Sequence, residues 1–305
     1  MTKGTNIECL FLFERTYKFQ KMEGLLDPHY VCEPYEAIGA INDSLQPECF
    51  NGMKIEITKQ HNENLVTGHY FTIEPPSPKG QKFNRIHSFL YSGYWGNIIA
   101  RLDNEMKGSF LSSFNLLSKQ ISGSLRIANG EDNEIEAGID GKVSGFGKCF
   151  GMRYEKGGLY VLNLMQKITD SCSVGTECCL IPSKRIRTNS YGLLWNITPQ
   201  IISTFIYSQL NQTLFSTLRY SPSQYLTYGC QFVYQNKPQK AIYGLLAFEH
   251  SSQDSSFKTI VNTQGTLSSC FQTNLCQIAS NLLLSVQANP FIGSYSWGAS
   301  IQIFR

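Results

Sequence analysis

From Gly52 to Phe304 the sequence alternates between apolar and polar residues with a period of two, in one segment after another. Successive side chains of a β-strand point to opposite sides, so this period predicts strands with one apolar and one polar face. Turn-forming residues separate the segments, as at Asn129–Asn133 and Ala288–Pro290. Between such turns we find roughly nineteen segments. Clear apolar sets are Met53, Ile55 and Ile57; Ile121, Leu125 and Ile127; Ile135, Ala137 and Ile139; and Tyr295, Trp297, Ala299, Ile301 and Ile303.

The first fifty residues lack this alternation and form a separate segment. Pro34 and Glu36 are typical of a helix start, so we predict a short helix over Glu33–Ile41. No long linker interrupts the region from Gly52 to Phe304. The predicted organisation is therefore an N-terminal segment, residues 1–50, whose short helix we expect inside a pore, followed by one domain at residues 51–305.

The composition indicates that this domain lies in a membrane. No stretch reaches the roughly 18 apolar residues of a membrane-spanning helix. Charged residues are only 16% of the chain, against about 25% in soluble proteins. Polar uncharged residues fill the difference, which suits a barrel with a hydrated interior and a lipid-facing exterior. Because an open sheet would leave backbone groups unpaired in lipid, we predict an all-β transmembrane β-barrel of roughly nineteen strands. A soluble β-rich protein is the alternative, and it would usually carry more surface Lys and Glu.

Several function classes find no support in the sequence. The net charge of +3 is too weak to indicate nucleic-acid binding. The ten cysteines lack metal-ligand spacing, and Glu249–Ser252 and Ser144–Gly147 form neither a nucleophile elbow nor a phosphate loop. We therefore expect no enzyme activity, metal or cofactor. The apolar stretch Cys9–Phe13 is too short for a secretory signal, which argues against a bacterial outer-membrane protein.

The last predicted strand carries a specific pattern. Ser296, Gly298, Ile301 and Ile303 stand at the polar, glycine and two hydrophobic positions of a short C-terminal motif. This motif resembles the sorting signal that mitochondrial outer-membrane barrels present to their assembly machinery. An amphipathic strand with an unpaired edge can add to another sheet, so we predict that these four residues form the sorting signal.

Further motifs resemble the channel-forming subunit of the mitochondrial outer-membrane protein translocase, a member of the eukaryotic porin superfamily. They are Pro34-Tyr35-Glu36, Phe50–Lys59, Val66–Ile73 and Thr259–Thr266, in which Asn262 stands where the family often has Asp. The resemblance runs from Pro34 to Phe304 in matching order. It implies a protein-conducting channel that imports unfolded precursor polypeptides. The implied partners are the translocase receptor and its small helical subunits within the membrane lipid, together with a homodimer of channels.

We predict that the charged residues of the polar strand faces line the pore and contact precursors. They are Lys54, Glu56, Arg126, Glu134, Glu136, Asp140 and Lys142. In the resembling family, acidic lumenal patches guide basic targeting peptides. The competing interpretation is hydrated interior residues without a recognition role. The rival function is a metabolite porin like the voltage-dependent anion channel, but its Gly-Leu-Lys motif does not occur here, and the acidic run Glu134–Asp140 argues against a positive lumen.

Overall fold

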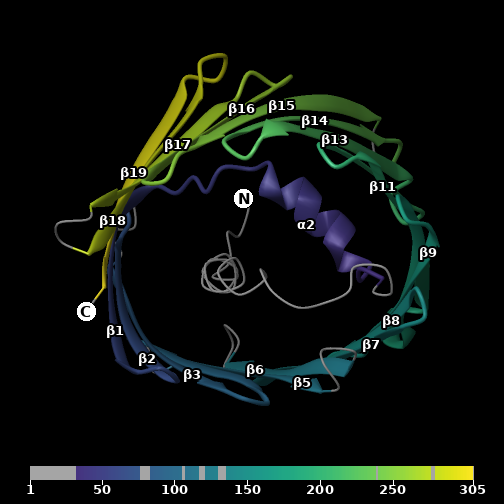
Figure 1. The fold of residues 1–305 in the computed structure, drawn as a ribbon, viewed down its shortest axis with the longest axis horizontal. Helices are drawn as coiled ribbons and strands as arrows, with labels where there is room; N and C mark the ends of the chain where they lie inside the picture. The colour runs from purple at the N-terminus through teal and green to yellow at the C-terminus, as the bar shows by residue number, and fades with distance from the viewer. Residues whose placement is uncertain are drawn as a thin grey trace.

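The chain forms a single closed β-barrel of 19 strands in the computed structural model (Figure 1). The structure describes residues 32–75, 83–104, 107–116, 121–129, 135–237, 240–275 and 279–304. The predicted pore residue Glu134 and the apolar stretch Cys9–Phe13 lie outside the described residues. The strands are β1 Gly52–Asn62, β2 Leu65–Ile73, β3 Phe83–Gly93, β4 Gly96–Asp103, β5 Gly108–Leu116, β6 Ile121–Asn129, β7 Ile135–Gly145, β8 Lys148–Glu155, β9 Leu159–Thr169, β10 Cys172–Ile181, β11 Ile186–Thr198, β12 Ile201–Ser208, β13 Thr213–Ser223, β14 Leu226–Gln235, β15 Ala241–Ser251, β16 Ser255–Asn262, β17 Leu267–Leu275, β18 Ser280–Asn289 and β19 Ser294–Phe304.

The barrel closes through a parallel pair between its first and last strands. Strand β1 pairs with β19 in a register that runs from Gly52 opposite Gly298 to Thr58 opposite Phe304. Every other neighbouring pair is antiparallel, as in β1 with β2 and β18 with β19. An odd number of strands in up-and-down order brings the two end strands together in the same direction. The predicted strand number and all-β barrel are confirmed.

The two faces of the barrel wall differ in polarity, as the alternation predicts. In β9, for example, the outward Leu162 and Leu164 are exposed, whereas the inward Asn163 and Met165 are buried. Large apolar side chains cover the outer face all round the barrel: Ile55, Phe89, Leu125, Ile139, Val143, Phe150, Val174, Phe205, Leu218, Phe232, Leu246, Val261, Phe271, Leu284 and Ile301. An exposed apolar surface of this extent marks a lipid or protein contact surface. The fold fits a multi-pass β-barrel membrane protein.

Short turns join the strands. Between β7 and β8 only Phe146 and Gly147 remain, with φ of 51° and 71°. Positive φ at both central residues is typical of the two-residue hairpin turn whose twist matches that of the strands. At the β16–β17 turn the Oδ1 atom of Asn262 accepts hydrogen bonds from the backbone nitrogens of Gln264 at 3.0 Å and Thr266 at 2.9 Å. Asn262 therefore performs the turn-stabilising role that an Asp can also perform.

One helix, α2, precedes the barrel and spans Glu36–Ser44. Figure 1 shows it inside the ring of strands, along the wall near β11 to β13. The helix starts and ends three residues later than predicted, which corrects our Glu33–Ile41 range. The first helical hydrogen bond runs from the nitrogen of Ala37 to the carbonyl of Pro34, and Pro47 follows the last turn. Among the described residues no helix is long and apolar enough to cross a bilayer.

Candidate functional site

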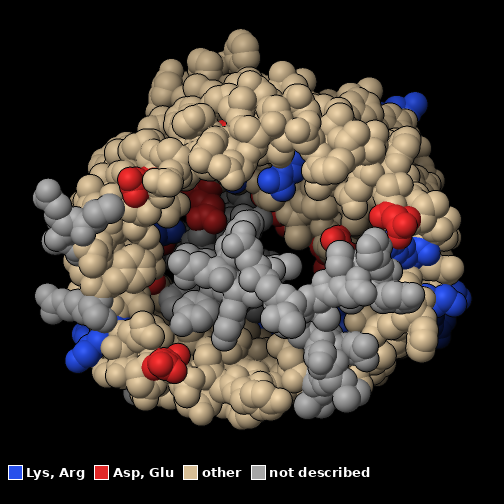
Figure 2. All heavy atoms as spheres, viewed as in Figure 1, with Lys and Arg blue, Asp and Glu red and all other residues tan. Residues whose placement is uncertain are grey.

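The acidic side chains of the strands all belong to the inner face of the barrel. The strand registers place them on the side opposite the exposed apolar residues: Glu56, Asp103, Glu136, Asp140, Glu155, Glu177 and Glu249. Figure 2 looks along the barrel and shows acidic side chains around its opening. Basic residues also occur on the inner face, namely Lys54, Arg101, Arg126, Lys142, Arg153, Lys167, Arg219 and Lys258. The lumen is therefore a hydrated surface of mixed charge.

The outer face carries only basic charges among its described strand residues. These are Lys59, Arg85, Lys148 and Arg187, and each lies at most three residues from a strand end. Long basic side chains near strand ends can extend to the lipid headgroups. Carboxylates are thus confined to the lumen, where water can solvate them. The alternation predicted inward charged residues such as Glu56 and Asp140, whereas the basic residues on the outer face were not anticipated.

Lys54, Glu56 and Arg126 lie on the inner face, as predicted. The Nζ atom of Lys54 lies 4.2 Å from the centroid of the Phe50 ring. The carboxylate of Glu56 accepts a hydrogen bond of 3.2 Å from the hydroxyl of Thr58. Arg126 and Arg101 line the same small cleft between β4, β5 and β6. These three residues are accordingly spread along the β1–β6 part of the wall rather than gathered in one site.

Glu136, Asp140 and Lys142 share the inner face of β7. Glu136 is exposed to the lumen, and Asp140 accepts a hydrogen bond from Ser124 on β6. The Nζ atom of Lys142 lies 3.4 Å from a carboxylate oxygen of Glu36 on helix α2. The structure thus assigns Lys142 a partner within the protein, whereas Glu136 remains open to the pore. Whether any of these residues contacts a precursor stays a prediction.

Residues 32–51, which we call the belt, run along the inner wall from β8 to β19. Glycines on the wall make room for the belt's large side chains. A Cβ atom at Gly192 on β11 would lie 2.6 Å from the Cδ1 atom of Ile38 and 2.8 Å from the ring of Tyr35. A Cβ atom at Gly229 on β14 would lie 2.5 Å from Leu45. The belt's side chains therefore fill space that a larger residue at either glycine would occupy.

Polar contacts fix the belt along its length. Besides its ion pair, Glu36 accepts a 3.0 Å hydrogen bond from the side-chain amide of Asn163 on β9. The Nζ atom of Lys258 on β16 donates to the carbonyl of Ser44 at 2.8 Å, at the carboxyl end of α2. A cation is favourable at that end of a helix. The belt is therefore held by complementary charges at both ends of its helix.

A buried hydrogen bond holds the last turn of the helix. The hydroxyl of Thr204 on β12 donates to the side-chain oxygen of Asn42 at 2.8 Å, and the two residues are 1% and 8% exposed. We expect Asn42→Ala to weaken belt docking by about 1–3 kcal/mol, because the hydroxyl of Thr204 loses its partner without gaining water. The loss can be measured by recording, at increasing urea concentrations, how far the belt is still protected from a protease. Adding Thr204→Val should restore part of it, and a double variant as weak as Asn42→Ala alone would contradict the assignment.

The belt contacts were not anticipated from the sequence. Glu36 was recognised as an early helical acid and as part of the Pro34-Tyr35-Glu36 motif, but neither role predicted its contacts with Lys142 and Asn163. Each pairs with a residue far away in the chain, and local periodicity contains no information on such distant partners. The Gly spacing offered the best available hint, since an inward glycine within a strand often marks a close approach of another segment.

The residues of the predicted sorting signal divide between the two faces of β19. Ser296 and Gly298 belong to the inner face, and Ile301 and Ile303 point outward. A Cβ atom at Gly298 would lie 2.5 Å from the carbonyl oxygen of Phe50. Gly298 therefore has a packing role in the folded barrel, in addition to any role in sorting, which stays a prediction.

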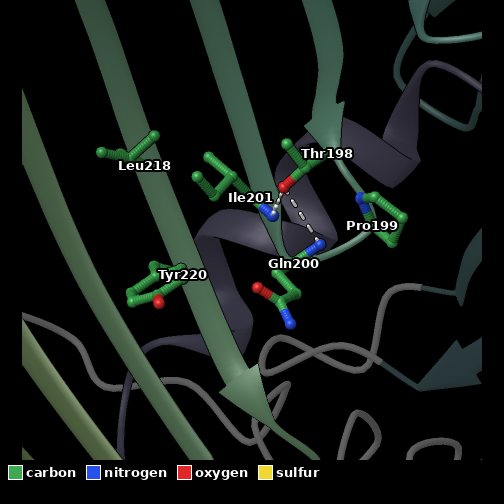
Figure 3. Close-up of a pocket in the computed structure, with 6 residues that line it drawn as sticks. All are labelled: Thr198, Pro199, Gln200, Ile201, Leu218 and Tyr220. Atoms are coloured by element: carbon green, nitrogen blue, oxygen red, sulfur yellow. Dashed lines mark hydrogen bonds between the residues drawn. The ribbon is translucent and has the colours of Figure 1, made fainter.

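A groove lies on the outer wall, away from the lumen. It has a volume of about 560 Å³ and is lined by Thr198, Pro199, Gln200, Ile201, Leu218 and Tyr220. Figure 3 shows Thr198 shaping the β11–β12 turn, where its hydroxyl accepts hydrogen bonds from the nitrogens of Gln200 and Ile201 at 3.3 and 3.1 Å. Its lining carries no group suited to catalysis. Within the described residues no cluster of three or more His, Cys, Asp or Glu could hold a metal ion.

The site is thus the barrel lumen with its belt and its inward carboxylates. Comparison with known proteins adds no assignment to this geometry. No protein-family model matches the chain, and no curated protein matches its sequence.

Proposed function

We propose that this barrel is a protein-conducting channel that imports unfolded precursor polypeptides across the mitochondrial outer membrane. One observation carries the proposal: every described strand carboxylate faces the lumen. Within this lumen of mixed charge, the carboxylates can attract basic segments at individual places, and the rest of the wall presents water and polar groups to an extended chain. The resemblance of Pro34–Phe304 to the translocase channel supports the same reading. We further propose that the receptor and the small helical subunits of the translocase bind the lipid-facing wall, as does a second copy of the channel.

The proposed mechanism is physical. Attraction between exposed charges is screened beyond about 8–10 Å at physiological salt, so only a peptide that follows the wall is guided. The acidic residues are distributed along the wall rather than gathered in one deep pocket, so weak successive contacts permit sliding. Direction then has to come from partners on either side of the membrane. Glu136, which is open to the pore, and Asp140 beside it are the residues to test first.

The test is conductance of the purified protein in planar bilayers, titrated with a basic amphipathic peptide. The wild-type channel should prefer cations and be blocked by the peptide. The double variant Glu136→Gln/Asp140→Asn should bind the peptide roughly tenfold more weakly, because two charges worth about 0.5–1 kcal/mol each at exposed sites are removed. The matched control is Glu63→Gln/Glu74→Gln, which removes two exposed charges outside the strands and should keep the block.

The second candidate is a metabolite porin, and a specific observation favours it. Arg101 and Arg126 line one cleft of the inner wall, and paired guanidinium groups attract phosphate or carboxylate anions. This candidate predicts an anion-preferring conductance that is indifferent to the basic peptide. That outcome would reject import of precursors and leave the barrel itself intact.

A further inference from the structure

Each of the two cysteines in the belt lies beside a cysteine of the barrel wall. At the start of the belt, Cys32 belongs to one buried cluster with Cys149 of β8, together with Tyr35, Ile38 and Met165. Cys32 is 2% exposed and Cys149 3% exposed, and the two thiols lie within electrostatic reach of one another. The belt therefore begins in the same buried cluster as a thiol of the wall.

The end of the belt repeats this arrangement on the far wall. The Sγ atom of Cys49 lies 3.7 Å from the carbonyl oxygen of Ser269, the residue that precedes Cys270 on β17. Cys270 is 8% exposed, and its thiol lies close to the belt backbone at Glu48 and within electrostatic reach of Cys49. Two independent belt-to-wall cysteine pairs thus lie at opposite ends of helix α2.

The other described cysteines do not share this arrangement. Cys172, Cys178 and Cys230 belong to the outward face of their strands. Cys179 faces inward, where its thiol lies 3.9 Å from a carboxylate oxygen of Glu177. All eight described cysteines are free thiols. Buried cysteines alone can be small packing residues, but packing does not explain why both belt cysteines meet wall cysteines.

We propose that Cys32–Cys149 and Cys49–Cys270 are a pair of redox latches, which on oxidation lock the belt onto the lumenal wall. The oxidant is a small disulfide such as oxidised glutathione. When one end of the belt lifts, a cysteine thiolate attacks the glutathione disulfide, its S–S bond breaks, and one glutathione leaves as thiolate and takes up a proton. When the belt returns, the paired cysteine attacks the mixed disulfide and releases the second glutathione. Two protein thiols are oxidised and one glutathione disulfide is reduced.

The state of the latches controls how freely the belt can leave the wall. In the reduced state only packing, hydrogen bonds and ion pairs hold it. In the oxidised state both ends are covalently fixed and the helix cannot move into the pore. Burial raises the pKa of both the Cys32 thiol and the Cys49 thiol above that of an ordinary cysteine. Both therefore stay protonated and unreactive at neutral pH while the belt is seated, since the thiolate is the nucleophile. This inference concerns the belt and is independent of what the channel carries.

The experiment is oxidation of the full-length barrel in lipid vesicles with increasing oxidised glutathione, followed by non-reducing peptide mass spectrometry. We expect peptides linked through Cys32–Cys149 and through Cys49–Cys270, with loss of alkylation at these four thiols and full recovery after dithiothreitol. Cys32→Ser should lose only the first link and Cys49→Ser only the second, while the outward Cys230→Ser should lose neither. In planar bilayers, oxidation should suppress conductance fluctuations caused by belt movement, and dithiothreitol should restore them.

Two results would overturn the proposal. One is stable glutathione adducts on Cys32 or Cys49 with no link to their partners. The other is linkage of the belt cysteines to Cys179 or Cys230 in amounts equal to the proposed pairs. Because the chemical mapping requires no transport substrate, it remains decisive even if the channel proves to conduct metabolites instead of polypeptides.

Discussion

Gly192→Leu is expected to expel the belt from the wall while the barrel stays closed. The new side chain would occupy the space of Ile38 and Tyr35, whose atoms lie 2.6 and 2.8 Å from the position of a Cβ atom at Gly192. Overpacking costs about 1–3 kcal/mol, and exposing one large apolar side chain costs about 1.5–3 kcal/mol more. The remaining hydrogen bonds and ion pairs of the belt contribute only about 1 kcal/mol each, so they do not offset that sum. Limited proteolysis in lipid vesicles should then cut within residues 32–51, and the pore conductance should fluctuate more.

The matched control is Gly141→Leu on β7. Gly141 is on the outer face, and a Cβ atom there meets nothing within 4 Å. This variant should keep the belt protected and the conductance unchanged. Equal protease protection of the belt in Gly192→Leu and in the wild type would show that the belt does not occupy this seat.

Ile301→Arg is expected to have the second large effect, a loss of barrel stability in lipid. Ile301 points outward from β19 and lies opposite Ile55 in the closing pair of strands. An arginine on the lipid face costs about 2–4 kcal/mol near the middle of the bilayer, because its charge loses water. The barrel can be unfolded with urea in lipid vesicles, and the folded fraction at each urea concentration can be read from its heat-dependent mobility on gels. The shift of the unfolding midpoint measures the loss of stability.

The neighbouring substitution Gln302→Arg serves as the control. Gln302 is on the inner face opposite Glu56, so the new guanidinium group would be hydrated and near a carboxylate. We expect a smaller loss of stability than for Ile301→Arg, because the guanidinium group would face the Glu56 carboxylate and not lipid. If both variants unfold at the same urea concentration, the assignment of inner and outer faces on β19 is wrong.

Much of the fold follows from local pattern. Alternation at residues such as Leu125 and Ile139 was sufficient to predict strands and which face meets lipid, because a strand has only two faces. Because the strand number is odd, the first and last strands, β1 and β19, run parallel where the barrel closes. Helix α2 was anticipated near Pro34, but its range was wrong by three residues at each end. Helix ends depend on individual hydrogen bonds, here that from Ala37 to Pro34.

The candidate site was predicted only in part. The inward direction of Glu56, Glu136 and Asp140 follows from strand parity, so these positions could be found without a structure. The ion pair of Lys142 with Glu36 could not, nor could the seat of Ile38 at Gly192. Such contacts join the belt to strands distant in sequence, and they depend on where the belt crosses the barrel.

The sequence by itself determined the type of barrel, the inward direction of its carboxylates and the outward direction of its apolar residues. These properties depend on neighbours two positions apart along the chain. Only the tertiary structure decided the path of the belt, the glycines that receive it and the pairing of Cys32 with Cys149 and of Cys49 with Cys270. Those properties arise when closure of the barrel curves distant strands around one lumen, which brings together residues that no local period relates.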